Sequence, residues 1–129
     1  MTHSHCESIL VIEDDQSIRI AIQHALELEG YIVLAAADGK EGLEILRSAD
    51  RPCLILLDLM MPIMNGWQFL EELRNDQESM IATLPVIITS AAGRAADSAV
   101  QMAQGYIKKP INLDILLDIV AKFCGVPVV

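Results

Sequence analysis

The stretch I-L-V-I-E-D-D at residues 9–15 decides the fold class, because an unbroken aliphatic run ends abruptly in acidic residues. Such a run is typical of a strand buried on both faces, as in a parallel sheet. After Asp15, a candidate helix N-cap, apolar residues recur at helical spacing as far as Gly30. A buried strand followed directly by a helix is the building unit of α/β proteins.

The same unit recurs along the whole chain. The predicted strands are residues 9–12, 32–36, 53–57, 86–89 and 105–108, and helical spacing follows each of them. The weakest of the predicted helices is alanine-rich and covers residues 95–103. Five units in 129 residues fit an open, doubly wound parallel sheet better than a barrel, which needs roughly 250 residues. We therefore expect a flavodoxin-like fold with strand order 2-1-3-4-5 and helices on both faces.

The composition predicts one acidic domain with an aliphatic core. Apolar residues make up 53% of the chain but aromatic residues only 4%, and the formal net charge is −9. This charge argues against direct binding to nucleic acid, whose affinity rests mostly on Lys and Arg. We expect a flexible leader at residues 1–8, the folded domain at 9–124 and a short tail at 125–129.

The remaining global features concern the compartment. The three cysteines lie far apart in the sequence, which indicates neither a disulfide framework nor a zinc site and favours a reducing environment. No apolar run reaches the roughly 18 residues of a spanning helix, and the N-terminus is polar. We expect a cytoplasmic protein that does not insert into membranes.

Polar side chains stand where the predicted strands end. Glu13 and Asp14 follow the first strand, Asp58 the third, Ser90 the fourth and Lys109 the fifth. In open α/β sheets, function collects beyond the carboxyl ends of the strands. The first and third strands would be neighbours, so three carboxylates would converge. Their mutual repulsion makes full ionisation costly unless a cation is present.

Oxygen ligands of this kind suit Mg²⁺. Asp14 and Asp58 would be direct ligands, Glu13 would act through a water, and the backbone carbonyl of Met60 could complete the set. Asp58 is the candidate nucleophile toward phosphorus, because a carboxylate can form an aspartyl phosphate. Lys109 offers a point charge and Ser90 a hydroxyl to the phosphoryl oxygens. Each residue alone also fits an ordinary turn or surface role, so the inference rests on the complete set.

These residues resemble a known family. The stretch D-L-M-M-P-I-M-N-G at 58–66 is similar to the phosphoacceptor loop, D-x-x-M-P-x-M-[DN]-G, of response regulator receiver domains in two-component signal transduction. Three further stretches resemble parts of the family. Residues 10–15 are similar to its first strand and acidic pair, and residues 85–91 to its fourth strand with the switch hydroxyl. Residues 106–110 are similar to its closing motif. The resemblance covers residues 9–123, and with the chain ending at Val129 it favours a stand-alone, chemotaxis-regulator-like receiver.

The resemblance implies that Asp58 accepts a phosphoryl group from a phosphohistidine of a sensor histidine kinase or phosphotransfer protein, with Mg²⁺ required. It also implies a cis Lys109-Pro110 bond, and a switch in which Ser90 shifts toward the phosphate while Tyr106 rotates inward. The switched surface would bind a downstream protein, or the phosphoryl group would be relayed onward. Such a domain catalyses only its own phosphorylation and dephosphorylation and is not otherwise an enzyme.

One departure from the family keeps a second hypothesis open. Only 19 positions separate Ser90 from Lys109, fewer than the family pattern has, so the intervening helix or its turn is shortened. The alternative is a degenerate receiver that binds proteins independently of phosphorylation. A magnesium phosphohydrolase is disfavoured, because it would typically carry a second acid two positions after the nucleophile, where Met60 stands.

Overall fold

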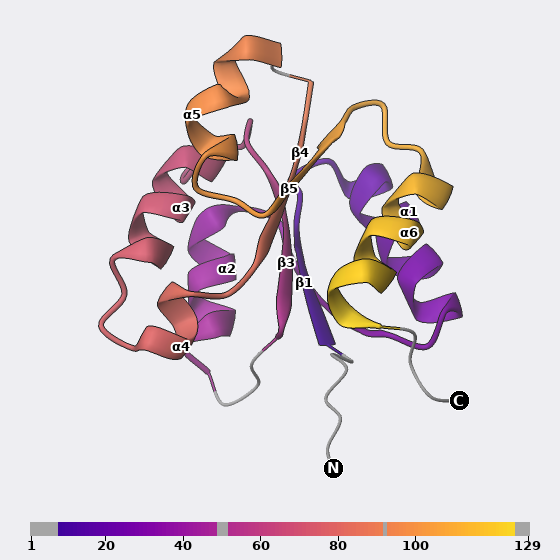
Figure 1. Ribbon diagram of the computed structural model, residues 1–129, viewed down its shortest axis with the longest axis horizontal. Coiled ribbons are helices and arrows are strands. Elements are labelled where there is room, and N and C mark those ends of the chain that lie inside the picture. Colours follow the sequence, from indigo (N-terminus) through magenta and orange to yellow (C-terminus); the bar gives the residue numbers. More distant parts are fainter. Residues whose placement is uncertain (1–7, 49–51, 92, 126–129) are drawn as a thin grey trace.

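The computed structural model describes residues 8–48, 52–91 and 93–125, which form a five-stranded parallel sheet between two layers of helices (Figure 1). The strands are β1 (Ser8–Ile12), β2 (Ile32–Ala36), β3 (Leu54–Asp58), β4 (Val86–Ser90) and β5 (Gly105–Lys108). Their order is β2-β1-β3-β4-β5, and every neighbouring pair is parallel. The predicted fold class and strand order are confirmed.

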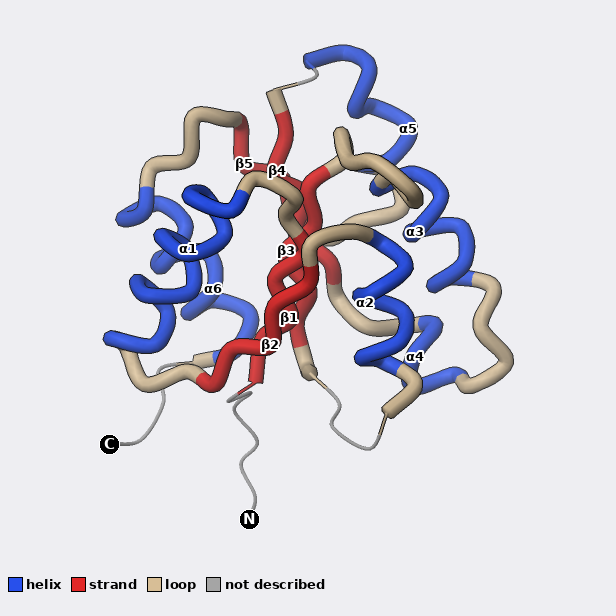
Figure 2. The backbone as a smooth tube through the Cα atoms, turned by 180° about the vertical axis from the view of Figure 1, so that it is seen from behind, coloured by secondary structure: helices blue, strands red, loops and turns tan. Residues whose placement is uncertain are grey.

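The helices divide between the two faces of the sheet. They are α1 (Gln16–Leu28), α2 (Gly39–Leu46), α3 (Gly66–Arg74), α4 (Ser79–Ala82), α5 (Asp97–Val100) and α6 (Leu113–Cys124). Helices α1 and α6 lie together on one face, while α2, α3, α4 and α5 lie on the other, as both views show (Figures 1 and 2). Among the described residues, no helix combines the length and the apolar content needed to cross a bilayer.

The core is aliphatic and follows the pleat of the strands. In β1, Ile9 and Val11 pack toward α1 and α6, while Leu10 and Ile12 pack toward the opposite helices. Strand β3 alternates in the same way and is buried along its whole length. Burial on both faces explains why these strands are unbroken aliphatic runs in the sequence.

Side-chain caps fix where the helices begin. The predicted cap Asp15 accepts a hydrogen bond from the N–H of Ile18 at 3.0 Å, at the start of α1. Asn65 caps α3 and forms a reciprocal capping box with Gln68. Capping oxygens satisfy N–H groups that a helix start leaves without intrahelical partners. The loops after β1 and β3 therefore end at defined points, close to the ends of their strands.

The segment between β4 and β5 differs from the prediction. In place of a helix over 95–103, a 3₁₀ turn, η1 (Gly93–Ala96), leads into the single-turn helix α5. Gly93, at the start of this turn, has a φ of +60°, in the left-handed region that glycine adopts readily. The buried contacts of this segment include the small side chains of Ala96 and Ala99, which offer little apolar surface for a longer helix to bury. Helix α4 was not predicted, because a single turn leaves no helical periodicity to detect.

The cysteine expectation is wrong for Cys53, which is disulfide-bonded. Cys124 is free and buried, and Cys6 lies outside the described residues. The N–H of Cys53 donates to the carbonyl of Ser8 at 3.0 Å, so Cys53 sits beside the beginning of β1. Separation along the sequence thus does not measure separation in space, and cysteine usage gives no argument for a reducing compartment.

Arg74 ties the end of α3 to three neighbouring segments. Its Nη1 donates to the carbonyls of Ala82 and Leu84 at 3.0 and 2.8 Å, and its Nη2 donates to the carbonyl of Met102 at 2.7 Å. These carbonyls belong to the end of α4, to the turn before β4 and to the turn before β5. One half-buried guanidinium therefore holds in place the segment that carries α5.

Replacing Arg74 by alanine is expected to lower the free energy of unfolding by about 2 kcal/mol, because several carbonyls lose a charged donor. Urea denaturation followed by circular dichroism measures this change. The control is Arg47→Ala, at the exposed end of α2, which should leave stability nearly unchanged. Equal stability of the two variants would contradict the anchoring role of Arg74.

Candidate functional site

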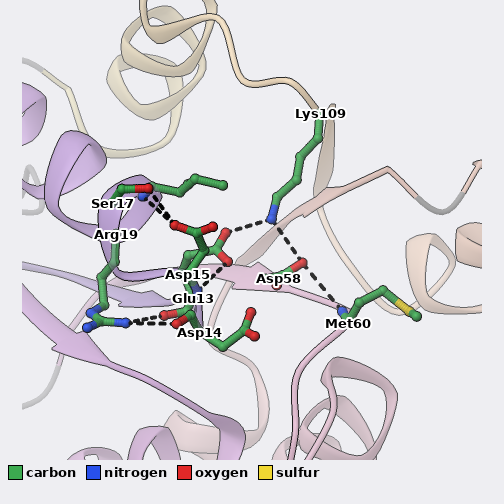
Figure 3. Close-up of polar contacts among 9 residues, drawn as sticks. Glu13, Asp14, Asp15, Ser17, Arg19, Asp58, Met60 and Lys109 are labelled. Carbon is green, nitrogen blue, oxygen red and sulfur yellow. Dashed lines mark hydrogen bonds and ion pairs between the residues drawn. The ribbon is translucent and has the colours of Figure 1, made fainter.

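The predicted site residues meet at the carboxyl edge of the sheet, and Figure 3 shows Glu13, Asp14, Asp58, Met60 and Lys109 among them. Asp58 is the last residue of the central strand β3, and Glu13 and Asp14 follow the neighbouring strand β1. Ser90 ends β4 on the other side of β3, and Lys109 directly follows β5. The strand order therefore brings together residues that are up to 96 positions apart.

Three carboxylates form the floor and rim of this site. One oxygen each of Glu13, Asp14 and Asp58 lies within 4.8 Å of the others. Glu13 and Asp58 are 1% and 3% exposed, whereas Asp14 is exposed, so the cluster opens to solvent on the Asp14 side. Carboxylates packed this closely repel one another when ionised, and hard oxygen donors with access to water fit Mg²⁺. The donor set thus suits a divalent cation, as the sequence predicts.

Lys109 already pairs with two of these acids. Its Nζ lies 2.7 Å from Oε1 of Glu13 and 3.3 Å from Oδ1 of Asp58. The peptide bond from Lys109 to Pro110 is cis, as the family resemblance implies. The Lys109 backbone N–H donates to the carbonyl of Ser90 at 3.0 Å, which ties the residue to the end of β4. The ammonium group is therefore held over the carboxylates.

The environment raises the pKa of Asp58 and of Lys109. Burial and the charge of Glu13 raise the pKa of Asp58 to about 7, although the charge of Lys109 opposes this rise. For Lys109, burial lowers the pKa, but the hydrogen bond with Glu13 and the charge of Asp58 outweigh it, so that the pKa is raised overall. Lys109 is therefore charged at neutral pH, while Asp58 needs a cation to be fully ionised there.

The loop after Asp58 is held close to the site. The N–H of Met60 donates to Oδ1 of Asp58 at 3.4 Å, and the N–H of Gly66 donates to the carbonyl of Leu59 at 2.9 Å. A Cβ on Gly66 would lie 2.6 Å from Cα of Leu59 and 2.7 Å from the carbonyl oxygen of Asp58. Only glycine allows this close approach of the loop to the end of β3.

The variant Gly66→Ala is expected to lose about 2 kcal/mol of stability, because the added methyl group meets backbone atoms that no rotamer change can move. Alanine's better helix propensity, about 1 kcal/mol or less at a helix start, does not offset this cost. Thermal or urea unfolding measures the loss. Gly105→Ala is the control, because a Cβ there would be no closer than 3.4 Å to Ile87. Similar stabilities for the two variants would argue against a tight contact at Gly66.

Ser90 and Tyr106 are also brought together. Ser90 is fully buried, and the half-buried Tyr106 donates its hydroxyl hydrogen to the carbonyl of Ser90 at 3.1 Å. Tyr106 packs against the apolar cluster on the α5 side of the sheet. The two residues named as a switch pair are thus in contact, while their movement stays a prediction. The role of the Met60 carbonyl as a ligand likewise stays a prediction.

The sequence did not single out Arg19. This residue, on α1, donates from Nη1 to the carbonyl of Glu13 at 2.7 Å and, over a longer 3.4 Å, to that of Asp14 (Figure 3). No pattern of residue types marks such a contact, because the acceptors are backbone atoms. The only available signal was a basic residue on the helix that follows the acidic pair.

Comparison with known proteins agrees with this geometry. The family model described as "Response regulator receiver domain" matches residues 9–121. The receiver domain of the Francisella response regulator 1452 superposes with a TM-score of 0.80 at 29% identity, covering 91% of this chain and 95% of that one. The receiver domain of the sensor histidine kinase PA1611 from Pseudomonas aeruginosa PAO1, solved with a magnesium ion coordinated in its active site cleft, has a TM-score of 0.81 at 25% identity and covers 92% and 98%.

A curated relative is longer than this chain. The transcriptional regulatory protein CseB of Streptomyces coelicolor is 38% identical over 112 residues, which are 84% of this chain but 45% of that protein. The chain thus spans less than half the length of curated relatives that it matches.

Proposed function

Because the chain belongs to the response regulator receiver family, we propose that it accepts a phosphoryl group on Asp58 from a phosphohistidine of a sensor histidine kinase or histidine phosphotransfer protein. The observation that carries this proposal is the placement of Asp58: its carboxylate is within 4.8 Å of two further carboxylates and 3.3 Å from the Lys109 ammonium. A nucleophile, a divalent-cation site and a cation for the phosphoryl oxygens therefore lie together at the carboxyl edge of the sheet.

The transfer follows from these positions. An oxygen of Asp58 bonds to phosphorus, the phosphorus–nitrogen bond of the phosphohistidine breaks, and the imidazole keeps the electron pair. Glu13, Asp14 and Asp58 would hold Mg²⁺, with the Met60 carbonyl as a further ligand, and when bound the ion supplies neutralising charge to the transferring group. The Lys109 ammonium would give up its contact with Asp58 and pair with a phosphoryl oxygen. The Ser90 hydroxyl would donate a hydrogen bond to another phosphoryl oxygen.

The phosphoryl group would then act on the segment next to Ser90. Ser90 shares its carbonyl with Tyr106 and Lys109, so a shift of Ser90 would be felt by both residues. We infer that this coupling alters the surface of α5, β5 and α6 for a downstream protein partner, or that the group is relayed onward.

In this proposal the domain catalyses only its own phosphorylation and dephosphorylation. It works in the cytoplasm, where ATP supplies the phosphohistidine, and its charge of −9 disfavours direct contact with nucleic acid.

The single turn of α5 favours one second candidate, a receiver that binds its partner without phosphorylation. Beryllofluoride, which mimics the phosphoryl group on an aspartate, separates the two candidates. We expect ¹⁹F NMR to show bound beryllofluoride with Mg²⁺ for the wild type and for the control Asp118→Asn on the exposed side of α6. Asp58→Asn should show none. Absence of binding to the wild type would favour the phosphorylation-independent candidate.

A further inference from the structure

The geometry points to Arg19 as a positioning residue that aims the acidic pair Glu13 and Asp14 at the bound cation. This inference rests on the proposed function, because it assigns Arg19 to the same Mg²⁺ site. Arg19 touches neither the acidic side chains nor the phosphoacceptor in the described contacts. It holds the backbone from which the two acids project.

The contact joins a helix to the loop that precedes it. Nη1 of Arg19 lies 2.7 Å from the carbonyl oxygen of Glu13 and 3.4 Å from that of Asp14. Arg19 itself is half-buried and sits in α1, whose start is fixed by the Asp15 cap. The guanidinium is therefore a short, charged bridge between a rigid helix and the two residues that carry the acids.

Among the described residues, other hydrogen bonds hold the beginning and the end of this loop, and Lys109 pairs with the Glu13 side chain. The N–H of Glu13 donates to the carbonyl of Ala36 at 3.0 Å, which continues the pairing of β1 with β2. The N–H of Asp15 donates to Oε2 of Glu13 at 3.2 Å, where α1 is about to begin. Arg19 acts on the peptide groups between these two points. The direction of the Asp14 side chain, on the exposed rim of the site, thus depends on a backbone that Arg19 holds.

Charge and positioning predict opposite effects on metal affinity. The guanidinium is a positive charge near the cation site, so its removal would by electrostatics alone tighten the binding of Mg²⁺. Loss of the bridge would weaken binding, because groups that orient metal ligands typically contribute about 10- to 100-fold to affinity. The sign of the change therefore separates a positioning role from a purely electrostatic one.

The test is a calorimetric titration of Mg²⁺ alone into the full chain and its variants. We expect Arg19→Ala to raise the dissociation constant for Mg²⁺ by about 10-fold. Arg19→Lys keeps the charge and one donor, and should fall between Arg19→Ala and the wild type. Arg47→Ala, which removes an exposed arginine after α2, should bind Mg²⁺ as the wild type does.

Phosphorylation by acetyl phosphate gives a second readout. With Arg19→Ala, the Mg²⁺ concentration for half-maximal rate should rise by the same factor of about 10, while the rate at saturating Mg²⁺ stays at the wild-type value. A variant that is merely misfolded would lose the saturating rate instead. If Arg19→Ala does not fold, Arg19→Lys decides the question through its own affinity for Mg²⁺.

Unchanged or tighter Mg²⁺ binding by Arg19→Ala, or by Arg19→Lys where only that variant folds, would overturn the positioning role and leave the proposed function intact. Failure of the wild type to bind Mg²⁺ would overturn both. These two failures are distinguishable in the same titration.

Discussion

Lys109→Ala is expected to lower the free energy of unfolding of the metal-free protein by about 3 kcal/mol at pH 8, because it leaves buried carboxylates without their cation. The Lys109 ammonium lies 2.7 Å from Glu13 and 3.3 Å from Asp58, and both acids are nearly fully buried. Urea denaturation in the presence of EDTA measures the change. Adding Mg²⁺ should restore part of the lost stability, since the ion supplies the missing positive charge.

The neighbouring residue provides the control. Lys108 is exposed at the end of β5, so Lys108→Ala should change stability little. The cost of Lys109→Ala should also shrink at pH 5, where protonation of Asp58 removes one of the stranded charges. A Lys109→Ala variant as stable as Lys108→Ala at pH 8 would show that the ion pairs do not neutralise the acidic cluster.

Asp58→Asn is expected to raise the free energy of unfolding of the metal-free protein by about 2 kcal/mol at pH 8. Burial and the charge of Glu13 raise the pKa of Asp58 from 3.8 to about 7, so ionised Asp58 destabilises the fold. The opposing charge of Lys109 is already included in this raised pKa. The variant removes the charge and should be the more stable protein wherever Asp58 is ionised.

The pH dependence of this difference has a definite sign. Between pH 3.8 and about 7 the folded protein holds a proton on Asp58 that the unfolded chain has released, so wild-type stability falls as pH rises through this window. The advantage of Asp58→Asn over the wild type should therefore be largest at pH 8 and smaller at pH 5. Urea titrations at the two pH values test this, with Asp118→Asn as the exposed control. A pH-independent advantage would contradict the raised pKa.

The sheet was predictable because its strands are buried on both faces. The run from Ile9 to Ile12 and the run ending at Asp58 could only be central strands, and the acids that end them had to converge once the strand order was set. The sequence therefore predicted the clustering of Glu13, Asp14 and Asp58 correctly. The N-cap role of Asp15 follows from the same local chemistry.

What the sequence did not predict depends on contacts without a residue pattern. Arg19 and Arg74 bind backbone carbonyls, which any residue offers, so no spacing reveals their partners. The disulfide bond of Cys53 likewise follows from no spacing in the sequence. The length of α5 depends on how little surface alanine side chains bury, and the single turn of α4 is too short to leave a period.

The central claim is that Asp58 accepts a phosphoryl group in a Mg²⁺-dependent reaction, and intact mass spectrometry tests it most directly. The chain is incubated with acetyl phosphate and Mg²⁺, beside an EDTA control and the variants Asp58→Asn and Asp118→Asn. The account predicts one added phosphoryl group on the wild type and on Asp118→Asn, and none on Asp58→Asn or in EDTA. An adduct that persists on Asp58→Asn or in EDTA would contradict it.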